Sequence, residues 1–269
     1  MKFNWKLFII LLIASIFGWF AVLPYTLTLQ SSALQNLPVP LSVLLTVQFI
    51  QSLVISVIAI FAGLYFAKKV GFGLPILEGW LEGKPVKDYI KSILPISIGL
   101  GIIAGVLIIG LDYIFSFAGA VINVTSSQLT PPAWQGFLAS FYGGINEEIL
   151  LRLFLMTFIV WIFFKGLIGW ILFKIFKIKK TKIEKPTNLM IWSAIILAAI
   201  LFGIGHLPTL AAITTLTPIL IARTIILNSV GGIIFGWLYW KKGLESAMLA
   251  HFSADIILHV IPAILIGFI

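Results

Sequence analysis

Two adjacent acidic residues and an arginine lie inside a run of apolar residues. Glu147, Glu148 and Arg152 fall within the segment 136–164, which is long and apolar enough to cross a membrane. An ionised group in bilayer hydrocarbon costs roughly 2.5–3.5 kcal/mol on insertion scales, so each one needs a partner or a function. Glu148 and Arg152 are four residues apart on a helix and can form an ion pair. Glu147 is turned by about 100° from Glu148 and is the acid left for chemistry.

Glu147, Glu148 and Arg152 could instead form a purely structural ion cluster that holds helices together. The positions of the histidines help to decide between a structural and a catalytic role. The chain has three histidines, and all of them fall in or at the edge of apolar runs: His206, His251 and His259. Imidazole titrates near neutral pH, so a histidine beside a buried glutamate can transfer protons. Asp255 follows His251 by four residues on the same helical face, where either side chain can orient the other. These residues favour general acid–base chemistry.

Several other kinds of site are excluded by what the sequence lacks. It contains no cysteine, which excludes disulfides, thiolate metal ligands and a cysteine nucleophile. It has no His-Glu-x-x-His, Gly-x-Ser-x-Gly or phosphate-loop motif. We therefore expect no cofactor. The alternative is a zinc site built from Glu147, His206 and His251, a ligand set that leaves an open position for water.

The elements that position these residues are expected to be membrane helices. The 269 residues are 61% hydrophobic and 10% charged, and their long apolar runs are continuous rather than alternating, which favours helices over a barrel. We expect one all-α integral membrane domain, residues 1–269, with the first helix retained rather than cleaved as a signal peptide. Segment 166–180 is expected to be an interfacial helix or an extension of the fourth, with an eighth span as the alternative. The expected spans are 7–29, 42–66, 92–122, 136–164, 190–206, 218–240 and 246–268.

The basic residues predict the orientation of these helices. Of the 18 Lys and Arg residues, Arg152 and Arg223 lie inside the runs. All the others fall on one side of the membrane, and the opposite connections, near 30–41, 123–135 and 207–217, contain none. The positive-inside rule then predicts a cytoplasmic N-terminus and cytoplasmic basic loops. The net charge of +9 thus indicates contact with membrane lipid, not with nucleic acid.

Three short motifs in the second half of the chain resemble a known family. They are Glu-Glu-x-x-x-Arg at 147–152, Phe-x-x-x-His at 202–206 and, at 251–255, His-x-x-x-Asp where the family more often has His-x-x-x-Asn. This order is similar to that of the CPBP (CAAX protease and bacteriocin-processing, or Abi) intramembrane proteases, which include type II CAAX prenyl endopeptidases of the Rce1 kind. The resemblance covers about 136–258 and implies an intramembrane endopeptidase acting on a hydrophobic or prenylated peptide near the cytoplasmic side.

The resemblance also implies roles for the motif residues. Glu147 would be the general base, helped by His206, while Glu148 pairs with Arg152. His251 and residue 255 would stabilise the oxyanion. Ionised Asp accepts a hydrogen bond but cannot donate one, so Asp255 is either protonated or orients His251 from behind. The sequence favours the orienting role, because the two residues share a helical face.

The sequence also allows two other functions, and it places the candidate residues at different depths in the membrane. The family also contains non-catalytic scaffolds and bacteriocin-immunity proteins, and intramembrane acids and histidines equally suit a proton-coupled transporter, although no inverted repeat is evident. Straight helices would place Glu147 at mid-bilayer, His206 near the outer end of its helix and His251 near the cytoplasmic end of the last. The three can meet only if some helices are broken or offset, or if the stretch 207–220 re-enters the membrane.

Overall fold

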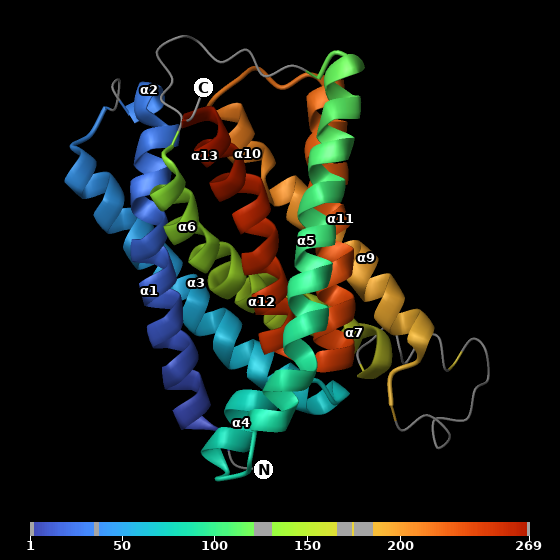
Figure 1. Ribbon diagram of the computed structural model, residues 1–269. Coiled ribbons are helices and arrows are strands. Elements are labelled where there is room, and N and C mark those ends of the chain that lie inside the picture. Colours follow the sequence, from blue (N-terminus) through green and yellow to red (C-terminus); the bar gives the residue numbers. More distant parts are fainter. Residues whose placement is uncertain (1–2, 35–37, 121–130, 166–173, 175–184, 268–269) are drawn as a thin grey trace.

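The chain folds into a bundle of helices (Figure 1). The computed structural model describes residues 3–34, 38–120, 131–165, 174 and 185–267, and within them there is no strand, as the sequence predicts. The elements, in order, are α1 (Trp5–Leu29), α2 (Ser31–Leu34), α3 (Leu41–Val70), α4 (Pro75–Leu81), α5 (Lys87–Phe117), α6 (Ala133–Tyr142), η1 (Gly143–Glu147), η2 (Ile149–Met156), α7 (Thr157–Lys165), α9 (Asn188–Gly205), α10 (Leu207–Ala211), α11 (Pro218–Lys242), α12 (Leu244–Asp255), η4 (Ile256–Val260) and α13 (Ile261–Gly267), where η marks a π-helical segment.

The membrane-spanning helices fall where the sequence predicts them. Six helices of the described chain are long and apolar enough to cross a membrane: Trp5–Leu29, Leu41–Val70, Lys87–Phe117, Asn188–Ala211, Pro218–Lys242 and Leu244–Leu265. A further helical run, from α6 through η1 and η2 to α7, crosses the bundle obliquely from the upper left of Figure 1 to its lower right. The helix expected at 166–180 lies, apart from Lys174, outside the described residues.

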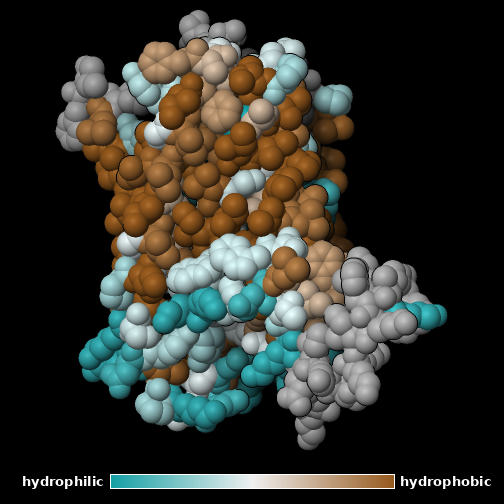
Figure 2. Space-filling view, turned by 90° about the vertical axis from the view of Figure 1, so that its right-hand side faces the viewer, coloured by the Kyte–Doolittle hydropathy of each residue, from teal (hydrophilic) through white to brown (hydrophobic). Residues whose placement is uncertain are grey.

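The outer surface of the bundle is apolar. Large side chains on the long helices are at least half exposed, among them Ile13, Val47 and Ile103. Figure 2 shows a broad hydrophobic belt on the face in view, with hydrophilic residues gathered below it. Hydrocarbon is the environment that such a belt matches. The chain is therefore an integral membrane protein.

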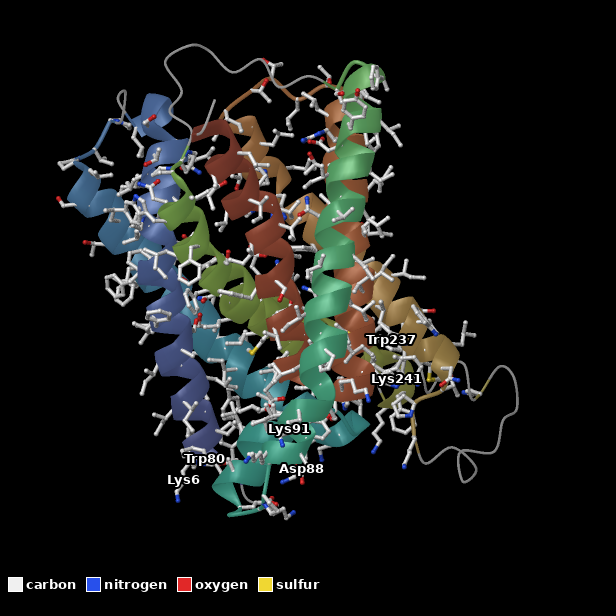
Figure 3. All side chains as sticks on the ribbon, viewed as in Figure 1. Lys6, Trp80, Asp88, Lys91, Trp237 and Lys241 are labelled. Carbon is white, nitrogen blue, oxygen red and sulfur yellow. The ribbon has the colours of Figure 1, made fainter. Side chains whose placement is uncertain are left out.

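One end of the bundle carries the basic side chains and is called the basic end below. There α1 begins, α5 begins and α11 ends, so residues far apart in the sequence come together (Figure 3). Lysines and tryptophans favour the membrane–water interface. Figure 3 labels Lys6, Trp80, Asp88, Lys91, Trp237 and Lys241 toward this end.

Two sets of contacts fix the helices that carry the motifs. At the basic end Oε1 of Glu245 accepts hydrogen bonds from the backbone N–H groups of Ile76 and Leu77, at 3.0 and 2.9 Å, which ties α4 to the first turn of α12. In the middle of the bundle α11 lies against α9. A Cβ atom at Gly232 would come within 2.6 Å of the Cβ of Ala199, so only glycine permits this approach.

Candidate active site

Glu148 and Arg152 form the ion pair that their four-residue spacing predicts. Nη1 of Arg152 lies 2.9 Å from Oε1 of Glu148, and both side chains are almost completely buried. The pair lies where η1 meets η2. In a π-helix the backbone hydrogen bonds run from residue i to residue i+5, which widens the turn and changes which side chains share a face.

Aromatic rings and backbone enclose the guanidinium of Arg152. Its Cζ lies 5.4 Å from the ring centre of Phe202 and 5.3 Å from that of Phe235. Its Nη2 donates to the carbonyl oxygen of Gly232 at 3.3 Å. Aromatic faces attract cations, so these contacts offset part of the cost of removing the charge from water. Arg152 thereby links η2 to α9 and α11.

The imidazole of His251 lies between the two glutamates. Its Nδ1 is 2.7 Å from Oε1 of Glu148, while its Nε2 is 3.5 Å from Oε2 of Glu147 and 3.7 Å from Oδ1 of Asp255. Phe235 stacks on the ring, with 4.6 Å between centroids. An ionised carboxylate only accepts hydrogen bonds, so Nδ1 carries a hydrogen and donates it to Glu148. His251 is therefore oriented by the hydrogen bond that its Nδ1 donates to Glu148, a contact that helical spacing did not indicate.

Asp255 and Glu147 face the same nitrogen of His251. The four-residue spacing does put Asp255 beside the imidazole, but the gap of 3.7 Å is longer than a hydrogen bond. Gly143 keeps this region open. A Cβ atom at that position would collide with the carboxylate of Asp255 and lie 3.1 Å from Nε2 of His251.

His206 caps the C-terminus of α9. Its Nδ1 lies 2.9 Å from the carbonyl oxygen of Phe202, and the two rings meet edge to face at 4.6 Å. Because a carbonyl oxygen can only accept, Nδ1 is the donor in this bond. The lone pair of Nε2 is then left to accept a proton.

One cavity of about 980 Å³ joins the motifs. Of the six residues to which the family resemblance assigns roles, four line it: Glu147, His206, His251 and Asp255. The buried ion pair completes the group behind the cavity wall. The difficulty over depth is resolved by the oblique path of the helix that carries the acids, by its π-helical turns and by the π-helical segment that follows α12 (Figure 1). The stretch after His206 forms the short helix α10, followed by the N-terminus of α11.

Asn146 anchors the segment next to Glu147, and the sequence reasoning missed it. Its Nδ2 donates to both the carbonyl oxygen and the hydroxyl of Ser15 at 2.9 Å, and that hydroxyl lies 2.8 Å from the hydroxyl of Ser56. These bonds join η1 to α1 and α3. The available signal was an amide in an otherwise apolar stretch directly before the acids, because a buried amide needs partners.

The other ionisable residues of the apolar runs, His259, Asp112 and Arg223, also line the cavity. Nδ1 of His259 is 3.2 Å from the hydroxyl of Tyr25, and its Nε2 is 4.0 Å from Oδ1 of Asp255. Asp112 pairs with Arg223 on another part of the wall, between α5 and α11. Every ionisable residue of the apolar runs thus has a charged or hydrogen-bonding neighbour.

The possible zinc ligands do not converge as a ligand set. Among the described residues, no group of three His, Asp or Glu side chains has an arrangement that could hold a metal ion. The side chains that the alternative requires, Glu147, His206 and His251, share the cavity wall without forming such a group.

Comparison with known proteins agrees with the motifs. No curated protein and no solved structure matches this chain. The family model described as type II CAAX prenyl endopeptidase Rce1-like matches residues 129–257, a segment that contains all three motifs. Over residues 129–257 the chain is therefore similar to the Rce1-like type II CAAX prenyl endopeptidases.

Proposed function

We propose that this protein is a membrane endopeptidase in which Glu147 activates a water molecule. The observation that carries the proposal is the position of His251. Glu148 fixes its Nδ1, and its Nε2 faces the carboxylates of Glu147 and Asp255 across 3.5 and 3.7 Å. A base and a hydrogen-bond donor thus border one small volume on the cavity wall. The family match supports peptidase chemistry in general.

The proposed reaction needs no covalent enzyme intermediate. Glu147 takes a proton from water while the water oxygen attacks the carbonyl carbon of the scissile peptide bond. A tetrahedral species forms, with negative charge on the former carbonyl oxygen. The C–N bond then breaks, and Glu147 passes its proton to the leaving amine. One water molecule is consumed for each bond cleaved.

His251 and Asp255 are the groups proposed to stabilise that negative charge. When Nε2 is protonated, His251 can donate a hydrogen bond to the oxyanion. Asp255 can donate only in its protonated form, because an ionised carboxylate would repel the oxyanion. The contact between Glu148 and Nδ1 supports this assignment, since it leaves Asp255 on the reacting side of the ring.

His206 is proposed to help position the water. The hydrogen of its Nδ1 is directed at the carbonyl oxygen of Phe202, so Nε2 can accept a hydrogen bond from water in the same cavity. Glu147 and His206 would then hold one water from two helices. Such preorganisation lowers the entropic cost of reaching the attacking geometry.

The substrate is proposed to be a hydrophobic or lipid-modified peptide, with a prenylated CAAX-type peptide as the specific case. The family supports this class, and a cavity of about 980 Å³ within a lipid-embedded bundle can take both an extended peptide and an apolar chain. Whether the prenyl group is required can be tested directly by comparing matched peptides.

The test is a cleavage assay with purified protein in lipid vesicles. Prenylated and unprenylated forms of one peptide are incubated with wild type and with Glu147→Ala, and products are identified by mass. Cleavage by wild type and none by Glu147→Ala supports the proposal. Binding of both peptides without any cleavage by wild type would instead indicate a non-catalytic membrane scaffold.

A further inference from the structure

The cavity occupies only one end of the bundle. On α1, its lining residues begin at Trp19 and continue to Gln30, the residue that caps the end of the helix remote from the basic end. On α3, which runs the opposite way, they lie between Gln48 and Ser56, in the half that precedes Lys68 and Lys69. Both helices therefore contribute only the half that is remote from their basic termini.

The other helices show the same asymmetry. On α11 the lining extends from Arg223 to Phe235 and stops before Lys241 and Lys242. On the chain from α12 to α13 it begins at His251 and continues to Pro262, away from the basic end. The reactive residues thus form the floor of the cavity, and the walls rise from them toward the end without lysines.

Apolar packing closes the route from the basic end. Between that end and the reactive residues lies a continuous core, in which every buried member is at most 6% exposed. It is drawn from α1, η2, α11 and the start of α12, and includes Leu7, Leu153, Leu238, Tyr239 and Leu244. Interiors packed in this way leave little room for water or peptide.

The cavity walls on the side remote from the basic end have polar groups that suit water. Gln48, Gln51 and Ser52 line it from α3, and the ion pair of Asp112 and Arg223 lines it from α5 and α11. Polar side chains in a membrane helix are costly unless they face a partner or a wet cavity. Their position therefore marks a hydrated path to the site.

We infer that water and substrate reach Glu147 from the membrane face opposite the basic loops. The part of this inference that concerns the substrate rests on the proposed peptidase function. The direction of access does not depend on it. By the positive-inside rule that face is extracytoplasmic, whereas the sequence led us to expect cleavage near the cytoplasmic side. The substrate is thus a peptide segment presented outside the cytoplasm, and within the proposed substrate class this favours a hydrophobic peptide over a prenylated CAAX-type peptide.

The depth of the site restricts that segment further. The lining residues of the last helices extend from His251 to Pro262, a distance of eleven residues. At about 1.5 Å per residue this corresponds to about 16 Å along the helix axis. An extended peptide covers about 3.3 Å per residue, so roughly five residues must enter in extended form. Substrates should therefore carry a flexible terminal stretch at least that long beyond any folded part.

Because the natural chain contains no cysteine, single cysteines can report which face reaches the cavity. Ser52→Cys places a thiol on the cavity wall, while Val54→Cys places one on the exposed apolar surface of the same helix. Glu82→Cys marks the basic end, and Ser116→Cys marks the opposite end of α5. Each variant is treated with a charged, membrane-impermeant maleimide in sealed vesicles of both orientations.

We expect Ser52→Cys to react in the same vesicle orientation as Ser116→Cys. In that orientation Glu82→Cys should be protected. Val54→Cys, which faces lipid, should stay unreactive in both orientations. Reaction of Ser52→Cys together with Glu82→Cys, or in neither orientation, would overturn the inference. The labelling does not depend on catalysis. A protein that labels as expected but cleaves no peptide would disprove the proposed function and leave the direction of access standing.

Discussion

Nδ1 of His251 lies 2.7 Å from the same oxygen of Glu148 that pairs with Arg152 at 2.9 Å. One carboxylate oxygen therefore holds a cation on η2 and the imidazole on α12, although 103 residues separate Glu148 from His251. Adjacent glutamates thus have different surroundings. Glu148 is fully enclosed and already engaged, while Glu147 lines the cavity.

Replacing Glu147 by glutamine should abolish peptidase activity without affecting folding. The amide keeps the volume of the side chain but cannot take a proton from water, and loss of a general base typically costs about 10²–10⁴-fold in rate. The measurement is kcat on a fixed peptide, alongside melting temperature in detergent. Glu82→Gln, the same change at an exposed site, is the control. Wild-type turnover by Glu147→Gln would disprove the proposed mechanism.

The buried ion pair should be needed for stability. Glu148→Ala or Arg152→Ala leaves an unpaired charge in a dry region, which typically costs about 3–5 kcal/mol. We expect a lower folded yield and a lower melting temperature for each variant. Glu82→Ala and Lys84→Ala break an ion pair of 2.6 Å at the exposed surface and should leave the melting temperature unchanged. Normal thermal stability of both buried variants would contradict a structural role.

Asparagine at position 255 should preserve activity and extend it to higher pH. If Asp255 acts as a protonated donor beside the oxyanion, wild type loses activity as pH rises and Asp255 ionises, whereas an amide donates at every pH. The measurement is a pH–rate profile of wild type and Asp255→Asn on one substrate. A large fall in activity of Asp255→Asn at neutral pH would restore the alternative, in which an ionised Asp255 orients His251.

Chelation should leave activity intact, because the proposed reaction depends only on side chains. The enzyme is incubated with EDTA or phenanthroline and assayed before and after addition of zinc. Loss of activity that zinc restores would favour the alternative in which Glu147, His206 and His251 are metal ligands. Inhibition that zinc fails to reverse would point to an effect of the chelator itself, which a non-chelating phenanthroline isomer controls for.

The sequence predicted whatever depends on neighbours along one helix. Long apolar runs must form helices in lipid, so the spans were found to within a few residues, and four-residue spacing gave the pair of Glu148 and Arg152. Contacts between helices were not predictable in this way. The bond between His251 and Glu148 and the one between Asn146 and Ser15 both depend on how distant helices pack, and no local period encodes that packing.

The π-helical turns around the acids have a consequence for insertions and deletions. Each such turn contains more residues than an α-turn, and removing one residue between Gly143 and Met156 would let the backbone return to α-helical spacing. The helix before and after the deletion would keep its relative orientation, because the π-turn is where the extra residue is accommodated. Within the turn, however, different side chains would share a face, so Glu147 and Glu148 would change their orientation while the length and hydrophobicity of the span stayed almost unchanged. Homologous chains that lack a residue here would keep a membrane helix but lose the geometry of the site.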